Sequence, residues 1–259
     1  MLAYKLSCGE YLDLYMLKIN VLTIFPSMFA GSFGHSINGR ALERGLAEIQ
    51  IHDIRSFSSD KHKTVDDAPY GGGPGMILML DPIVKAVESI KGDKSMPVIL
   101  LSPQGEVYNQ RKAEVLSSYE EIILICGHYE GIDHRIIELV VTDELSIGDF
   151  VLSGGEFAAM VLIDSLIRLL PGVLGNALGG LNDSHTTGFL QHPHYTRPEE
   201  YRGRKVPKVL LSGNHKAVDK WRCLESVRRT LIRRPDLIKE DTLSLEISNI
   251  VNQIKQEED

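Results

Sequence analysis

Two glycine-rich segments that also carry polar side chains are the first candidates for a chemical site. They are Cys126–Asp133 (CGHYEGID) and Ser146–Glu156 (SIGDFVLSGGE). Glycine lets backbone N–H and C=O groups reach a ligand without an intervening Cβ. Either segment alone is more simply a tight turn. Together, with Glu130 and Asp149 embedded in them, they favour a site for an adenine or a ribose. Neither has the GxGxxG pattern of ordinary dinucleotide-binding folds.

A third glycine-rich segment, Tyr70–Met76 (YGGGPGM), resembles a phosphate-binding loop only superficially. No Gly-Lys-Ser/Thr follows it and no predicted helix begins directly after it, so the loop of a nucleotide hydrolase is disfavoured. Its four glycines and one proline more simply predict an unusual backbone path or the close approach of another chain.

The elements that must position these segments alternate between strands and helices, which predicts an α/β fold with a mainly parallel sheet. The predicted strands are Leu17–Phe25, Ile51–Ile54, Pro97–Leu101 and Glu121–Cys126. The predicted helices are Gly39–Ile49, Asp81–Lys91, Asn109–Tyr119, Phe157–Leu170 and His215–Arg233. Little structure is predicted before Met16.

Two of these helices carry start signals. Asp81 is the predicted N-cap of its helix, with Pro82 at the first helical position. Ser153 and Glu156 have the spacing of a capping box in front of the apolar helix that follows them.

Bulk composition is that of a globular protein, with 259 residues of which 43% are hydrophobic. The longest apolar runs are too short to span a bilayer, and the first residues lack the apolar core of a secretory signal. Three scattered cysteines argue against a disulfide framework and favour a reducing, cytoplasmic setting.

The charge is unevenly distributed along the chain. The net charge is −7, yet Arg197–Arg234 holds twelve Lys and Arg against four Asp and Glu. This basic part suggests a phosphate-binding surface, with a solvated helical face as an equally good explanation. Five arginines there recur near helical spacing and are candidates for RNA contacts: Arg222, Arg228, Arg229, Arg233 and Arg234.

A long loop rich in Gly, Asn, Asp, Ser and Thr divides the chain. We predict an N-terminal extension over residues 1–15, an α/β domain over 16–175, an interdomain loop over 176–196 and a helical basic domain over 197–259. Three histidines near this loop, His185, His192 and His194, invite a metal site, but Pro193 gives poor ligand spacing and no cysteine lies nearby.

Seven motifs then occur in an order that resembles one family. They are YGGGPGM, LLSPQG, CGHYEGID, SIGDFVLSGGE, LIDSLIRLLPGVLG, HPHYTRP and VPKVLLSGNH. Together they resemble the bacterial tRNA (guanine-N1)-methyltransferases, the TrmD family, over roughly residues 17 to 240. The resemblance implies a SPOUT-like fold, in which the C-terminal part of the α/β domain forms a trefoil knot. Physical rules alone favour an open, unknotted sheet.

The resemblance implies that the glycine loops hold S-adenosylmethionine and that the methyl group goes to N1 of the guanosine just 3′ of the anticodon. The implied products are 1-methylguanosine and S-adenosylhomocysteine. The implied cofactor-binding residues are Leu100, Leu101, Ser102, Gly127, Tyr129, Glu130, Gly131, Ser146, Ile147, Gly148, Asp149, Phe150, Val151, Leu152, Gly154 and Gly155.

The resemblance also implies two catalytic residues. Asp183 would take the proton from guanine N1, and its removal from water as its loop folds over the substrate would strengthen it as a base. Arg168 would stabilise the charge that develops on guanine O6. From the residues alone, Arg168 is equally well a surface charge near a helix C-terminus.

Further expectations from the resemblance are a homodimer whose active site is shared between subunits, and a Mg²⁺ requirement to which Glu130 and Asp183 could contribute. Three residues depart from the family pattern: His128 stands where arginine is usual, Phe150 where tyrosine is common, and His185 where an aromatic residue usually follows the serine. The competing hypotheses are an RNA-binding module with a vestigial cofactor pocket and a phosphate-linked hydrolase.

Overall fold

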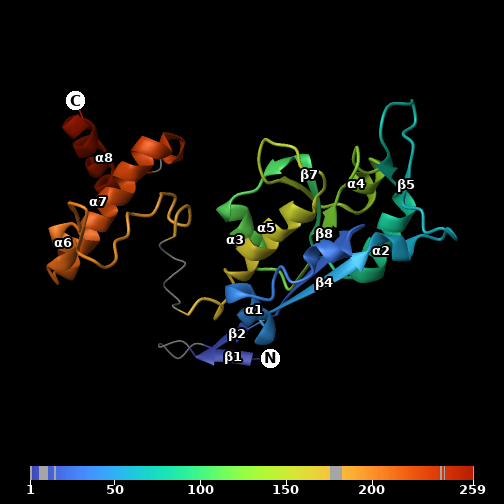
Figure 1. Ribbon diagram of the computed structural model, residues 1–259, viewed down its shortest axis with the longest axis horizontal. Helices are drawn as coiled ribbons and strands as arrows, with labels where there is room; N and C mark the ends of the chain where they lie inside the picture. Colours follow the sequence, from blue (N-terminus) through green and yellow to red (C-terminus); the bar gives the residue numbers. More distant parts are fainter. Residues whose placement is uncertain are drawn as a thin grey trace. The chain divides into compact units, whose positions relative to one another are not determined.

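A computed structural model describes residues 2–5, 11–14, 16–175, 183–239, 241 and 243–258 (Figure 1). The chain divides into two compact units, Met1–Ala177 and Leu178–Asp259. Each is described by itself. The predicted interdomain loop falls partly on residues 176–182, which lie outside the described residues.

The first unit is built on a five-stranded sheet in the order β4-β3-β8-β7-β9, and every pairing in it is parallel. The strands are β3 (Leu17–Thr23), β4 (Ala47–Asp53), β7 (Val98–Val107), β8 (Glu121–Cys126) and β9 (Asp143–Ser146). The apolar runs in β3 and β8 are buried because helices cover both faces of the sheet. The predicted α/β class with a mainly parallel sheet is confirmed.

Two helical layers enclose the sheet (Figure 1). One layer holds α1 (Ser36–Glu43), α3 (Gln110–Leu116) and α5 (Glu156–Ile167), with the 3-10 helix η1 (Pro26–Phe29). The other holds α2 (Leu80–Lys91), α4 (Arg135–Val140) and the 3-10 helix η2 (Ile54–Phe57). A short hairpin of β5 (Asp66–Asp67) and β6 (Ile77–Leu78) frames the segment Tyr70–Met76.

The prediction of little structure before Met16 was wrong. Strands β1 (Leu2–Lys5) and β2 (Tyr11–Leu14) pair antiparallel. Their sequences, LAYK and YLDL, do not alternate strictly between apolar and polar residues, so the local signal for a strand is missing.

The predicted helix Gly39–Ile49 was placed too far along the chain. Helix α1 begins at Ser36 and ends at Glu43, and the strand β4 already begins at Ala47. Gly45 causes the change, because its φ of +66° is a left-handed conformation that stops a helix.

The predicted N-cap Asp81 was also wrong. Helix α2 begins one residue earlier, at Leu80, with Met79 as its N-cap. Asp81 therefore lies in the first turn, where it pairs with Lys85 at 2.7 Å. A carboxylate in the first turn still interacts favourably with the helix dipole.

The second unit is mainly helical. It contains β10 (Glu200–Tyr201), β11 (Arg204–Lys205), α6 (Lys208–Leu211), α7 (His215–Arg233), the 3-10 helix η3 (Pro235–Leu237) and α8 (Leu245–Glu258). The bounds of α7 are those predicted from the sequence. Asn214 caps it by accepting a hydrogen bond from Ala217 N, and Val227 packs against Val251 and Ile254 of α8.

Among the described residues, none of the helices is both long enough and apolar enough to cross a membrane.

Candidate active site

A cavity of about 430 Å³ lies at the carboxyl ends of the neighbouring strands β8, β7 and β9. Ligands in parallel α/β proteins bind at this edge, because the loops that leave the strands converge there. The walls come from residues 100–104 of β7, from the loop after Cys126 and from the segment between β9 and α5.

The structure brings the predicted cofactor-binding residues together around this cavity, with the exception of Asp149. The sequence interpretation missed ten further lining residues: Pro103, Gln104, His128, Ile132, His134, Ile137, Glu144, Leu145, Ser153 and Ala158. His128, Ile132 and Ser153 lie inside the two glycine-rich segments and could have been included. Ile137 comes from α4, and no local pattern connects that helix to the site.

The two glycine-rich segments form adjacent walls of the cavity. Gly155 N donates a hydrogen bond to Gly127 O at 2.8 Å. A Cβ on Gly155 would lie 2.8 Å from the Cα of Cys126, closer than real side chains approach a backbone. Glycine is therefore required at position 155 because the start of α5 touches the end of β8.

The third glycine-rich segment lies against the same loop. Gly71, Gly72, Gly73 and Gly75 all have positive φ, so the unusual backbone path predicted for this segment is confirmed. Glu130 N donates to Met76 O at 3.1 Å, and a Cβ on Gly75 would collide with the Glu130 side chain. The close approach expected for this segment is therefore made by the loop of Glu130, which belongs to the same unit.

A buried carboxylate lies beneath the cavity. The capping-box prediction was wrong, because α5 has Gly155 as its N-cap and makes no side-chain cap. Glu156, which is 1% exposed, instead accepts a hydrogen bond at Oε1 from Thr23 Oγ1 at 2.7 Å. Tertiary contact with β3 therefore overrides the local signal.

Glu156 also faces the cavity wall. Its Oε2 lies 3.9 Å from Nδ1 of the lining residue His128. That nitrogen is buried and makes no hydrogen bond within the described part of the chain. Burial, together with the Glu156 carboxylate, raises the pKa of the adjacent Cys126 thiol well above its usual value. Cys126 is therefore an unreactive neighbour of the cavity at neutral pH.

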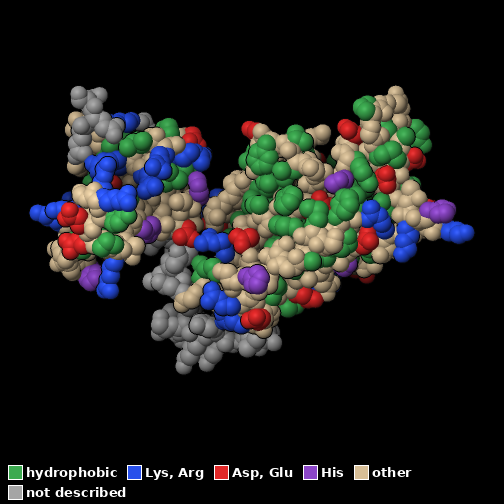
Figure 2. Space-filling model, in the orientation of Figure 1, with side chains coloured by type: hydrophobic (Ala, Val, Ile, Leu, Met, Phe, Trp, Pro, Cys, Tyr) green, Lys and Arg blue, Asp and Glu red, His purple; other side chains and the backbone are tan. Residues whose placement is uncertain are grey.

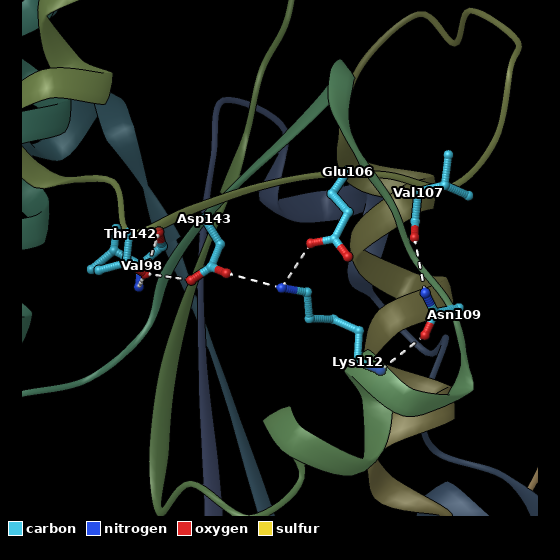
Figure 3. Close-up of polar contacts among 7 residues, drawn as sticks. All are labelled: Val98, Glu106, Val107, Asn109, Lys112, Thr142 and Asp143. Carbon is cyan, nitrogen blue, oxygen red and sulfur yellow. Dashed lines mark hydrogen bonds and ion pairs between the residues drawn. The ribbon is translucent and has the colours of Figure 1, made fainter. Parts of the chain in front are cut away.

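A lysine bridge secures the wall that β7 provides (Figure 3). The pairing of β7 with β9 shifts register between Leu101 and Glu106, so the intervening lining residues bulge toward the cavity. Lys112 of α3 joins Glu106 at 2.9 Å to Asp143 at 3.2 Å, across this bulge. The hydrogen bond to Glu106, with the Asp143 carboxylate, raises the pKa of Lys112, which remains charged at neutral pH.

The predicted catalytic residue Arg168 does not line the cavity of its own chain. It is the half-buried C-cap of α5, whereas Gly155 and Ala158 at the other end of that helix line the cavity. The twelve residues of α5 span roughly 18 Å. Arg168 shares the outer stripe of α5 with Phe157 and Val161, because their spacings of four and seven return to one helix face.

Asp183 belongs to the second unit, in a turn where Thr186 N donates to Asp183 O at 3.3 Å. The structure thus places the two predicted catalytic residues in different units. Within the described residues there is no cluster of three or more His, Cys, Asp or Glu side chains able to hold a metal ion. The rings of His192 and His194 instead lie 4.6 Å apart, beside Trp221.

Helix α7 presents the predicted basic surface (Figure 2). Arg222, Arg229 and Arg233 are separated by seven and four residues and so share one stripe of the helix. Arg228 lies off this stripe and pairs with Glu225 at 2.5 Å, and Arg234 pairs with Asp236 at 2.7 Å. The five candidate arginines are therefore not one uniform surface.

Comparison with known proteins gives a consistent result. The family model described as tRNA (Guanine-1)-methyltransferase TrmD matches residues 17–240. A tRNA (guanine-N(1)-)-methyltransferase of Dehalococcoides mccartyi is 53% identical over 244 residues, which is 93% of this chain and 98% of that protein. A protein of the same name from Bacillus cereus is 53% identical over 242 residues, covering 93% and 99%.

Proposed function

The chain belongs to the tRNA (guanine-1)-methyltransferase family, TrmD, and we propose that it methylates N1 of the guanosine just 3′ of the anticodon, with S-adenosylmethionine as donor. It is a tRNA (guanine-N1)-methyltransferase. The observation that carries the finer proposal is the cavity, because the two glycine-rich segments Cys126–Asp133 and Ser146–Glu156 form adjacent walls of it. The products are 1-methylguanosine and S-adenosylhomocysteine.

The residues around the cavity fit S-adenosylmethionine. Gly127, Gly131 and Gly148 bring bare backbone to its walls, which suits hydrogen bonding to the edge of an adenine. Apolar lining from Leu101 and Ile132 suits the faces of the ring. When bound, the cofactor supplies an activated methyl group on a sulfonium centre.

We assign the proton transfer to Asp183. Guanine N1 is a poor nucleophile while protonated, so its proton must pass to a base as the N1–methyl bond forms and the methyl–sulfur bond breaks. The Asp183 carboxylate receives that proton, and Arg168 stabilises the negative charge on O6. The cavity walls align the methyl group with N1, which is the proximity contribution to the rate.

The described residues do not support the expected Mg²⁺ requirement, because they contain no group of three or more His, Cys, Asp or Glu side chains able to hold a metal ion. The proposed reaction therefore assigns no step to a metal ion.

The outer face of α5 supports a homodimer (Figure 2). Phe157 is 56% exposed and Val161 is 49% exposed, next to Phe150 and Val151 at 54% and 85%. An apolar helix face of this kind is typical of a protein–protein interface. A second copy of the chain is the partner that we propose to cover it.

A symmetric dimer would also complete the active site. If two α5 helices pair in opposite directions, Arg168 of the partner subunit comes near the end of α5 that lines the cavity. The roughly 18 Å between the ends of one α5 would then no longer separate Arg168 from the cofactor. We extend this arrangement to Asp183, so that the partner subunit supplies both catalytic residues.

We also propose that the segment from β7 to the loop after α5 forms the trefoil knot of SPOUT enzymes. Two features support it. Strand β7 pairs with both β8 and β9, and a Cβ on Gly105 would touch the backbone of β9 at Glu144. The chain passes so closely at this point that only glycine leaves room.

A methyl-transfer assay tests the function. The protein is incubated with labelled S-adenosylmethionine and tRNA transcripts that carry or lack the guanosine 3′ of the anticodon. We expect label only in the first transcript, as 1-methylguanosine after digestion. Binding of tRNA without transfer would instead support an RNA-binding module with a vestigial pocket. The cytoplasm, where tRNA matures in bacteria, is the proposed location.

A further inference from the structure

In the loop that carries Asp183, Leu190 makes two hydrogen bonds to side chains of the basic helix α7. Thr230 Oγ1 accepts a hydrogen bond from Leu190 N at 2.9 Å, and Ser226 Oγ donates one to Leu190 O at 2.6 Å. Ser226 and Thr230 are one helical turn apart, so two neighbouring hydroxyls hold both backbone polar groups of one residue. We call these two hydroxyls the Leu190 clamp.

The clamp is rigid on the side of the helix. Thr230 is 0% exposed, and its hydroxyl also donates to Ser226 O at 2.7 Å. The Thr230 side chain is therefore held in one rotamer, because its hydroxyl accepts one hydrogen bond and donates another. Loss of the hydroxyl would leave Leu190 N without this acceptor, next to a side chain that is fully buried.

Further hydrogen bonds link the clamp to Asp183. Gln191 N, next to Leu190, donates to Ser184 Oγ at 2.9 Å, and Ser184 directly follows Asp183. Between these points the loop closes on itself, since His185 N donates to Phe189 O at 2.8 Å. Asp183 is thus held by a short, hydrogen-bonded path that ends on α7.

The clamp lies beside the surface that we assign to tRNA. At 100° per residue, Ser226 falls next to the stripe of Arg222, Arg229 and Arg233 on α7. Rigid-body contact of this stripe with tRNA phosphates would therefore set the position of Asp183 as well.

We infer that Ser226 and Thr230 are positioning residues that hold the Asp183 loop to the tRNA-binding helix, so that docking of tRNA brings the base into place. This rests on the proposed function. A proton acceptor that is misplaced by about 1 Å can cost roughly 100-fold in rate, even when both substrates still bind. The clamp should therefore govern turnover and leave substrate affinity unchanged.

The test uses the full-length protein with four variants. Thr230→Val replaces the hydroxyl with a methyl group of similar size, and Ser226→Ala removes the second clamp hydroxyl. Thr230→Ser retains the hydroxyl and serves as the rescue. Ser212→Ala is the matched control, because its exposed hydroxyl donates to Val209 O at 2.7 Å, at the end of α6 and away from the clamp.

We expect kcat to fall roughly 10- to 100-fold in Thr230→Val and Ser226→Ala, with the dissociation constants for tRNA and S-adenosylmethionine unchanged. Thr230→Ser and Ser212→Ala should keep kcat near that of the unmodified protein. Normal turnover in both clamp variants, or a loss of tRNA affinity that matches the loss of turnover, would overturn the inference. If circular dichroism shows that Thr230→Val is unfolded, the turnover of Ser226→Ala tests the inference alone, because Ser226 is only half-buried. Lack of methylation by the unmodified protein would instead refute the proposed function.

Discussion

At the scale of single residues, the site depends on two kinds of position. Some residues must lack a side chain, as Gly155 does where α5 touches β8. Others must supply a proton acceptor or a charge, as we propose for Asp183 and Arg168. The first kind determines whether the cavity exists, and the second determines what happens in it. Substitution of the first kind should therefore weaken cofactor binding, and substitution of the second kind should lower turnover.

Asp183→Asn should bind S-adenosylmethionine normally and lose most of its turnover, because the amide keeps the size of the side chain but cannot accept the N1 proton. General-base removal typically costs about 100- to 10,000-fold in rate. Isothermal titration and single-turnover methylation measure the two properties separately. Near-normal turnover would remove Asp183 from the role of base.

Gly155→Ala should weaken cofactor binding and lower the melting temperature, because its Cβ would lie 2.8 Å from the Cα of Cys126 and force β8 and α5 apart. Shifts of this kind cost about 1–3 kcal/mol. Gly175→Ala is the matched control, since a Cβ there meets nothing within 4 Å. Equal melting temperatures and affinities for the two variants would contradict this account of the cavity wall.

At the scale of elements, the start of α4 closes the loop that follows β8. Asp133 Oδ1 accepts from Arg135 N at 3.0 Å, and the carboxylate pairs with the guanidinium of Arg135 at 2.6 Å. These interactions hold the pKa of Asp133 below its ordinary value, and the hydrogen bond from the Arg135 guanidinium has the largest effect. The loop 127–131 that lines the cavity therefore ends at an electrostatically fixed point.

A depressed pKa in the folded state means that Asp133 contributes stability above its unfolded pKa and loses it as the pH falls through the folded pKa. Asp133→Asn should therefore lower the free energy of unfolding by about 0.5 kcal/mol at pH 7, a value discounted for solvent screening. The difference from the unmodified protein should vanish as the pH falls through the lowered folded-state pKa of Asp133. Urea unfolding measures both, with the exposed Asp93→Asn as control. A difference independent of pH would exclude the charge as its cause.

Helix α7 is the element that we assign to tRNA phosphates. Charge reversal at Arg229 and Arg233 together should weaken tRNA binding and flatten the dependence of log affinity on log salt by about 0.9 for each phosphate that the helix no longer neutralises. Reversal of Arg228 alone should have a smaller effect, because this side chain already pairs with Glu225 and lies off the stripe. An unchanged salt slope in the double variant would make the stripe a solvated surface.

At the scale of the whole molecule, the proposed dimer places the cofactor and the catalytic side chains on different subunits. Gly127→Leu should fill the cavity, since its Cβ would meet only Leu101 O, at 3.5 Å, and inactivate the subunit that carries it. When this variant is mixed with Asp183→Asn and subunits exchange, the mixture should recover about a quarter of the normal activity. About half of the dimers are then heterodimers, and each heterodimer has one complete site out of two.

Phe157→Glu in both proteins should abolish this recovery by placing charges in the apolar interface, and sedimentation should then show monomers. Recovery that is absent although subunits exchange would locate the complete site within one chain.

The sequence by itself determined the α/β class, the bounds of β8 and α7, and the two glycine-rich segments that line the cavity, because apolar periodicity and glycine clusters are local signals. Only the tertiary structure decided what those segments touch. Glu156 has the spacing of a capping residue, yet it is buried against Thr23 of β3, since a distant partner outweighs a local cap. The glycine-rich segments and Asp183 could both be picked out from the sequence, but the sequence did not show how they are placed in the fold. Their assignment to separate units, and the attachment of the Asp183 loop to α7 through Leu190, depend on contacts between residues that are far apart along the chain.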